Sequence, residues 1–210
     1  DLEGFLFPDT YVVTRSTSAA QIVDRMTANF REHFTPELQR KASALGLTTR
    51  QAVALASIVQ KETALVSEAP LVAGVYWNRL RRGMRLQADP TVIYALKRDG
   101  RWRGTLLRSD YDYESPYNTY MHEGLPPGPI ANPGSDALRA AVTPARTSYL
   151  YFVADPTTGG HTFSTTFEDH LVAVAEARRA RDEIPAPMGP EMPVTPTPTT
   201  ETPVQTGAEQ

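Results

Sequence analysis

The stretch from residue 48 to residue 63 combines a helix start signal with a long run of apolar side chains. Thr48 and Gln51 have the three-residue spacing of a capping box, which predicts that a helix begins here. Residues 52–59 contain one polar side chain, Ser57, and are otherwise apolar. A helix with this pattern is hydrophobic around most of its circumference, so we expect it to be buried on most sides.

The rest of the first hundred residues also shows helical periodicity. Apolar side chains recur every three or four residues, and the segments begin at Ser, Thr or Asp and end near glycine. Pro36 and Pro90 occupy early helical positions, where proline is tolerated, and we expect Asp89 to cap the last of these helices. The predicted elements are a short strand at Thr10–Thr14 and helices at about 16–34, 35–46, 67–83 and 89–96.

The second half of the chain changes character. Residues 115–133 are rich in Pro, Gly, Asn and Tyr. A loop of this length is usually functional or disordered, and its aromatic side chains favour an ordered loop. Ser135 is the expected cap of the helix that follows. The elements predicted after the loop are a helix at 135–142, strands at 149–153 and 161–164 around a turn, and a helix at 166–182.

This order of elements predicts an α+β fold that is mostly helical and carries a small β-hairpin. A chain of 210 residues can bury one substantial core, so we expect a single domain at residues 1–184. From residue 185 onward the sequence is largely Pro, Thr and Glu. Residues 185–210 are therefore expected to form a disordered tail.

Composition and charge exclude several classes of function for this chain. A net charge of -3 and a pI near 5.8 provide no basic footprint for nucleic acid. The absence of cysteine excludes thiol nucleophiles and cysteine-ligated zinc, and no apolar run reaches the roughly 18 residues of a membrane span. The four histidines lack the i, i+4 spacing of a helical zinc site, so we expect no metal and no other cofactor.

Glu62 is the strongest candidate for chemistry. On a helix it follows Ile58 by four residues and Val59 by three, so it shares their face. Burial disfavours the carboxylate anion, and the negative end of the helix dipole does the same. These are the conditions of a general acid at neutral pH. The alternative is that the helix has reached the surface and Glu62 is solvated, which is the commoner environment of glutamate.

Five blocks of sequence resemble the endolytic murein transglycosylases, the MltG or YceG-like family. The blocks follow the family's order and together span essentially residues 1–183. They read LEGFLFPDTY near the N-terminus, LASIVQKETA at 55–64, VYWNRLRRGMRLQADPTVIYAL at 75–96, YNTYMHEGLPPGPIANPG at 117–134 and YLYFVADPTTGGHTFSTT at 149–166.

The resemblance implies a lysozyme-like catalytic core, a membrane-anchoring helix upstream of this stretch, and activity on nascent peptidoglycan strands at the outer face of the cytoplasmic membrane. Peptidoglycan synthases are further candidate partners. The family's essential acid falls on Glu62. Many relatives carry glutamate where this chain has Gln60. Two residues along a helix turn a side chain by roughly 200°, so we do not expect Gln60 to share the chemistry.

The mechanism implied by the resemblance needs one carboxylic acid. Glu62 would protonate the glycosidic oxygen between MurNAc and GlcNAc and then withdraw the proton of the C6 hydroxyl of MurNAc. That hydroxyl attacks C1 and leaves a 1,6-anhydro end, and its intramolecular position replaces a second carboxylate. The loop candidates are expected to face the same groove as Glu62. The candidate substrate-binding residues in the matched blocks are Asn78, Gln87, Asp89, Tyr117, Asn118 and Thr119.

Two alternatives stay open. A muramidase-type hydrolase would need a second carboxylate at a defined separation, for which Glu68, Asp89 and Glu123 are candidates. A glycan-binding or scaffold module of the cell-wall machinery would use the same cleft without turnover. Binding sugar alone does not require a buried acid, which favours an enzyme.

Overall fold

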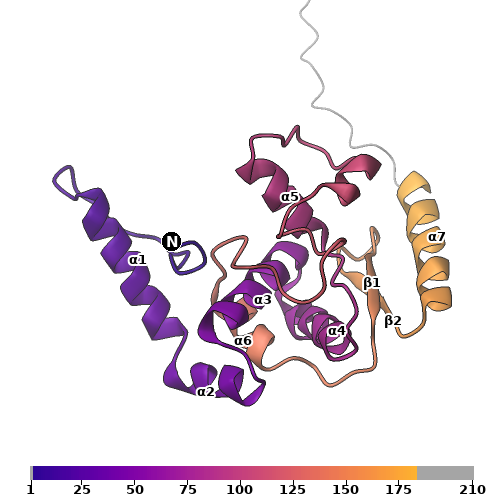
Figure 1. Ribbon diagram of the computed structural model, residues 1–210, viewed down its shortest axis with the longest axis horizontal. Coiled ribbons are helices and arrows are strands. Elements are labelled where there is room, and N and C mark those ends of the chain that lie inside the picture. The colour runs from indigo at the N-terminus through magenta and orange to yellow at the C-terminus, as the bar shows by residue number, and fades with distance from the viewer. Residues whose placement is uncertain (1, 184–210) are drawn as a thin grey trace, which may run out of the picture.

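The computed structural model describes residues 2–183 (Figure 1). The predicted α+β class is confirmed, whereas its lysozyme-like character stays a prediction. The expected tail at 185–210 lies outside the described residues. The elements are α1 (Ala19–His33), α2 (Pro36–Ala44), α3 (Thr49–Glu62), the 3-10 helix η1 (Val66–Glu68), α4 (Ala69–Arg81), α5 (Asp89–Arg98), the 3-10 helix η2 (Arg108–Asp112), α6 (Ser135–Val142), β1 (Tyr151–Ala154), β2 (His161–Ser164) and α7 (Phe167–Glu183).

Helix α3 lies at the centre of the fold. It packs against α2, α4, α5 and α6, and Figure 1 shows it in the middle of the ribbon beside α4 and α6. All residues from Ala52 to Val59 are buried, as the apolar run predicts. The capping box is also confirmed, because the side chains of Thr48 and Gln51 each accept a hydrogen bond from the other residue's main-chain N–H.

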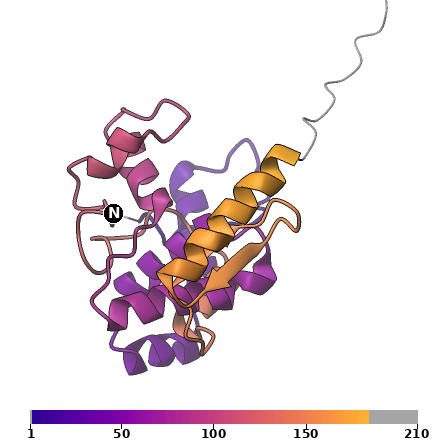
Figure 2. The same ribbon diagram turned by 90° about the vertical axis from the view of Figure 1, so that its right-hand side faces the viewer.

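The hairpin and α7 form a second layer at the side of the helical core. Strands β1 and β2 are antiparallel, with Phe152 opposite Phe163. Helix α7 packs against both strands, and Figure 2 shows it crossing the hairpin on its outer side. The hairpin therefore lies between α7 and the core helix α4, which β1 contacts.

The long loop that precedes α6 is ordered and runs along α3. Three side chains of α3 hold its main chain. Arg50 Nε donates to the carbonyl oxygen of Pro127 at 3.0 Å. The Ser57 hydroxyl accepts from the N–H of Ile130 at 2.9 Å. Further along the helix, Gln60 Oε1 accepts from the N–H of Gly134 at 2.9 Å.

Two details of the predicted strands are wrong. Residues 10–14 form no strand, and the segment is mostly exposed. The hairpin begins at Tyr151, because the main chain at Tyr149 and at residue 147 instead accepts hydrogen bonds from Asn78.

The cap assignments of two helices also need correction. Ala88 is the N-cap of α5, and Asp89 is the first helical residue, which frees its carboxylate for other contacts. Gly134 is the N-cap of α6 and Ser135 its first residue. Neither cap residue has a capping side chain of its own, and in α6 the amide of Gln60 supplies one acceptor.

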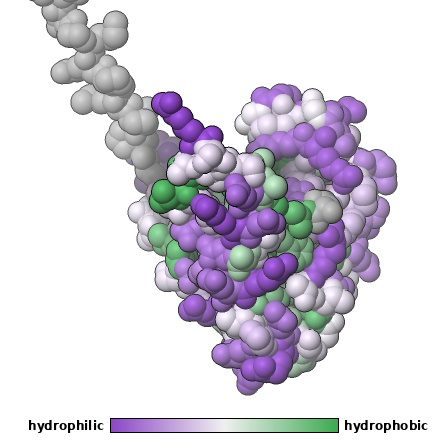
Figure 3. Space-filling model, turned by 90° about the vertical axis from the view of Figure 1, so that its left-hand side faces the viewer, coloured by the Kyte–Doolittle hydropathy of each residue, from purple (hydrophilic) through white to green (hydrophobic). Residues whose placement is uncertain are grey.

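The surface seen in Figure 3 is largely hydrophilic, with small separate hydrophobic patches. Over residues 2–183, no single helix is long and apolar enough to cross a membrane. The pair α2 and α3, bent by 95° at their junction, meets the length and composition criteria together. The apolar residues of α3 are buried inside the protein, so the core accounts for that apolar character.

We expect Ser57→Ala to lower the free energy of unfolding by about 1–3 kcal/mol. The hydroxyl lies in the core, and its removal leaves the buried N–H of Ile130 without a partner. Urea unfolding followed by circular dichroism measures the change. Ser43→Ala, at an exposed position of α2, is the matched control and should stay within about 0.5 kcal/mol of wild type. Equal stability of both variants would show that Ser57 does not hold the loop.

Candidate active site

Glu62 is the last residue of α3 and opens onto a cavity of about 600 Å³. The helix is buried up to Val59, so its C-terminal turn emerges from the core at the cavity wall. The solvated alternative for Glu62 is not what the structure shows, because the residue is partly buried among cavity-lining side chains.

The Tyr76 hydroxyl donates a hydrogen bond to Glu62 Oε1 at 2.8 Å. Burial of the Glu62 carboxyl raises its pKa to about 7, and this effect exceeds the lowering by the Tyr76 hydrogen bond. The charge of Asp89 raises the pKa further. Glu62 is therefore partly protonated at neutral pH, which allows it to donate a proton and to accept one.

Asp89 lies in the same cavity and accepts hydrogen bonds from two tyrosines. Tyr120 donates to Asp89 Oδ1 at 2.5 Å, and Tyr111 approaches Oδ2 at 3.4 Å. Burial, together with the negative charge of Asp89, raises the pKa of both phenols. Both hydroxyls therefore stay protonated, and the Asp89 carboxylate is held in place between them.

The opposite wall comes from α4, the hairpin and α7. Arg79 donates from Nε to the carbonyl oxygen of Leu150 at 2.7 Å, and its guanidinium lies 5.1 Å from the centroid of the Tyr151 ring. These contacts join α4 to β1. Residues that line the cavity from this side are Tyr151, Phe152, Val153, Phe167, His170, Val174 and Arg178.

Two of the six predicted substrate-binding residues line the cavity with Glu62. Asp89 does so through the carboxylate described above, and Gln87 lies beside it with a φ of 51°, in the left-handed region. The Gln87 side chain accepts a hydrogen bond from Arg79 at 3.4 Å. The short connection between α4 and α5 thus brings two of the candidates to the acid.

The expectation that Tyr117, Asn118 and Thr119 face the Glu62 groove needs correction. Asn118 is fully buried and donates to the carbonyl oxygens of Tyr111 and Tyr113 at 3.0 and 2.8 Å. Its Oδ1 accepts from the N–H of Tyr120 at 2.9 Å. These bonds satisfy the amide within the loop and position Tyr120.

Thr119 and Tyr117 also make contacts within the protein interior. The Thr119 hydroxyl accepts from the N–H of Ala88 at 3.0 Å and lies 2.9 Å from the Thr91 hydroxyl, so it joins the loop to α5. The Tyr117 ring is buried against Tyr94, with 4.7 Å between ring centroids.

Asn78 faces away from the Glu62 cavity. Its Nδ2 donates to the carbonyl oxygens of Thr147 and Tyr149 at 2.9 and 2.8 Å. Its Oδ1 accepts from Arg81 at 2.8 Å. Asn78 therefore anchors the segment that leads into the hairpin, and it borders a different hollow of the surface.

Sequence reasoning missed the tyrosines that surround the two carboxylates. The sequence presents Tyr76 as one more residue on an apolar helix face and Tyr120 as a packing residue. The sequence did contain an indication for Tyr76. It precedes Arg79 by three residues, so the two side chains lie on one face of α4, and a helix face with both a hydroxyl and a guanidinium indicates a polar site. For Tyr120, the signal is its place beside Asn118, whose turn-forming amide fixes the local chain.

Gln60 does not line the Glu62 cavity, as its place on the helix predicts. Its side-chain oxygen accepts from the N–H of Gly134, the N-cap residue of α6. Glu68 is likewise engaged elsewhere, since its carboxylate accepts from the N–H of His161 at 3.0 Å and lies 2.7 Å from His161 Nδ1. Glu123 is exposed. Of the three proposed second carboxylates, Asp89 alone lines the Glu62 cavity.

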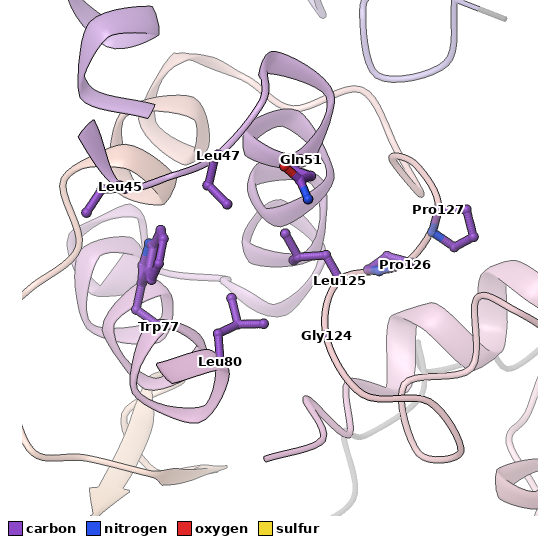
Figure 4. Close-up of a pocket in the computed structure, with 9 residues that line it drawn as sticks. All are labelled: Leu45, Leu47, Gln51, Trp77, Leu80, Gly124, Leu125, Pro126 and Pro127. Carbon is purple, nitrogen blue, oxygen red and sulfur yellow. The ribbon is translucent and has the colours of Figure 1, made fainter. Parts of the chain in front are cut away.

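A separate hollow of about 440 Å³ lies between the α2–α3 connection, α4 and the long loop. Figure 4 shows Leu47, Trp77, Leu80 and Leu125 directed into it, with Gln51 at its edge. Its lining contains no titratable side chain, so it offers no acid or base. Among residues 2–183, no three His, Cys, Asp or Glu side chains gather in a way that could hold a metal ion.

Comparison with known proteins relates this arrangement to a family. The endolytic murein transglycosylase of Streptococcus pneumoniae serotype 2 (strain D39 / NCTC 7466) is 37% identical over 177 residues, which cover 83% of this chain and 32% of that protein. The endolytic murein transglycosylase of Bacillus subtilis (strain 168) is 36% identical over 186 residues, covering 87% of this chain and 49% of that protein. The chain therefore spans about a third to a half of the length of these curated relatives.

A crystal structure of a YceG-like protein from Listeria monocytogenes superimposes with a TM-score of 0.73 at 37% sequence identity. The match covers 81% of this chain and 55% of that one. A model of the YceG-like family matches residues 1–176, which include all the residues of the Glu62 cavity except Arg178. The chain therefore belongs to the YceG-like family.

Proposed function

We propose that this chain carries the catalytic part of an endolytic peptidoglycan lytic transglycosylase, with Glu62 as its catalytic acid. The observation that carries the proposal is a carboxyl of raised pKa at the wall of a tyrosine-lined cavity. The names of the curated relatives support the reaction class.

In the proposed reaction, protonated Glu62 donates its proton to the glycosidic oxygen as the bond from C1 of MurNAc breaks. The resulting carboxylate then accepts the proton of the C6 hydroxyl of the same sugar, and the hydroxyl oxygen bonds to C1. The products are a 1,6-anhydro end and a free GlcNAc hydroxyl, and Glu62 regains its proton. One group serves as acid and base because its pKa of about 7 lies near the working pH.

The other lining residues would bind the sugars and stabilise the positive charge that develops at C1 as the glycosidic bond breaks. Tyr111, Tyr120 and the Tyr151 ring offer flat surfaces and hydroxyl groups, which suit the faces and edges of pyranose rings. The Asp89 carboxylate, fixed by two phenols, would stabilise positive charge that develops at C1. Tyr117, Asn118, Thr119 and Asn78 would act as positioning residues for this surface.

Hydrolysis is the second candidate, and the presence of Asp89 beside Glu62 is the observation that favours it. A carboxylate on the other side of C1 could activate a water molecule, which would give a reducing end. A glycan-binding module without turnover is less well supported, because it gives no reason to raise the pKa of Glu62.

The proposed setting is the outer face of the cytoplasmic membrane, with nascent peptidoglycan strands as substrate and peptidoglycan synthases as candidate partners. Membrane attachment would come from a helix outside this chain. These points rest on the family resemblance and on the names of the relatives.

Glu62→Gln should lower the cleavage rate of glycan strands by about 10²–10⁴-fold, because the amide has no proton to transfer. Mass spectrometry of the products tests the reaction as well as the residue. Wild type should yield ends that are lighter by one water than reducing ends. Glu123→Gln, at an exposed carboxylate, is the matched control and should retain full activity. Full activity of Glu62→Gln would contradict the assignment, and reducing ends from wild type would identify a hydrolase.

Tyr76→Phe should move the alkaline limb of the pH profile of kcat/KM to higher pH. The Tyr76 hydroxyl lowers the pKa of Glu62 by stabilising its anion, so its removal lets Glu62 hold its proton above pH about 7. Tyr113→Phe removes a hydroxyl that bonds Asp99 outside the cavity and should leave the profile unchanged. An unshifted limb in Tyr76→Phe would mean that another group sets it.

Glu62 should also make the protein less stable as pH rises from about 4.5 to about 7. The folded protein holds this proton to a pKa of about 7, whereas the reference value is 4.5, so the unfolded state loses its proton first and is favoured as pH increases. Relative to wild type, Glu62→Gln should therefore gain about 2–3 kcal/mol between about pH 4 and pH 8. Urea unfolding of both proteins at the two pH values measures the difference, and a constant difference would argue against a raised pKa.

A further inference from the structure

The lining of the Glu62 cavity divides into two chemically different groups of side chains. The first group, called here the carboxylate end, contains Glu62 and Asp89 together with the phenols of Tyr76, Tyr111 and Tyr120. The second group, called here the α7 end, comes from β1 and α7. It combines apolar and aromatic side chains with Arg178 and contains no carboxylate.

One face of α7 forms this second end. Phe167, His170, Val174 and Arg178 are separated by three, four and four residues, the spacing of a single helix face, and all four line the cavity. The His170 ring stacks on Tyr151, with centroids 5.2 Å apart and 20° between the planes. Burial and the nearby charge of Arg79 lower the pKa of His170, which favours the neutral ring.

Arg178 is the cation at this end that is available to a ligand. Arg79 also lines the cavity, but it is buried and donates to the main-chain carbonyl oxygens of Leu150, Leu86 and Arg85. Arg178 is exposed, and within residues 2–183 its side chain makes no hydrogen bond or ion pair. Its neighbour Arg179 is also exposed, but donates to the carbonyl oxygen of Ala175 on its own helix and does not line the cavity.

We infer that the α7 end of the cavity binds the acidic peptide substituent of the glycan strand, with Arg178 as the residue that determines this specificity. The inference rests on the proposed function, since the lactyl group of MurNAc carries a short peptide with small side chains and free carboxylates. Val153, Phe167 and Val174 form an apolar surface suited to methyl groups, and a guanidinium binds a carboxylate in a bidentate manner.

The distribution of charge would also fix the direction in which the strand enters. A carboxylated peptide is repelled by Asp89 and by ionised Glu62, and is attracted by Arg178 at the other end. A strand placed with its peptide toward α7 has its sugar ring at the carboxylate end, where the proposed chemistry takes place. The reverse placement would bring three negative groups together.

Two substrates and two arginine variants test the inference. The substrates are un-cross-linked peptidoglycan strands that carry their peptides and the same strands after an amidase has removed them. Wild type should show a lower KM for the peptide-bearing strands, and Arg178→Gln should reduce that preference by about fivefold with little change in kcat. Arg178→Lys should keep part of the preference, and Arg179→Gln should keep all of it.

Ionic strength gives an independent readout. The preference of wild type should shrink as salt is raised, because the proposed contact is an exposed ion pair, whereas the weaker preference of Arg178→Gln should respond less. Equal KM values for both substrates in wild type, or an equal effect of Arg178→Gln and Arg179→Gln, would overturn the inference while leaving cleavage intact. A wild-type protein that cleaves neither substrate would overturn the proposed function, and the inference with it.

Discussion

Burial of the Glu62 carboxyl is the constraint on which the proposed chemistry depends. Burial is the largest of the effects on its pKa, and the hydrogen bond from Tyr76 opposes it without cancelling it. Without burial the group would titrate near its reference value of 4.5 and would be an anion at neutral pH. The proton is retained because α3 ends at a wall of aromatic side chains, to which the hairpin contributes Phe152, whose ring packs edge-on against Tyr76. The hairpin layer of the fold therefore helps to set the pKa of Glu62, which belongs to the helical layer.

The long loop contributes to the site chiefly as a scaffold. Asn118 uses its amide to fix the main chain at Tyr111, Tyr113 and Tyr120, and Thr119 joins the same turn to the start of α5. The result is that two tyrosine hydroxyls converge on Asp89. A polar residue in a motif is thus not always one that meets the ligand, since a buried amide whose groups are all satisfied by main chain serves to place its neighbours.

The central helix and its acid could be predicted from the sequence because both depend on local periodicity. The capping box, the apolar run and the face of Glu62 are all set by residues within four positions of one another. The identity of the residues around Glu62 could not be predicted in this way. Tyr76, Tyr120 and Tyr151 come from three separate segments, and which side of each points to the cavity is decided by long-range packing. The predicted cap of α6 was wrong for a related reason. The N-cap lies one residue earlier than expected, at Gly134, whose N–H is held by the Gln60 side chain of α3.

Helix α3 also sets the spacing and the relative orientation of the loop contacts and of Glu62. Arg50, Ser57 and Gln60 bind successive positions of the loop main chain along this helix. Glu62 follows Gln60 by two residues and lies on a different face of the helix. Adding or deleting one residue between Ser57 and Glu62 would turn the acid by about 100° relative to the loop contacts. The length of this helical segment is therefore constrained, in addition to the identities of the residues that make these contacts. The exposed turn around Gly104, where an added Cβ would meet nothing within 4 Å, can change in length without altering that register.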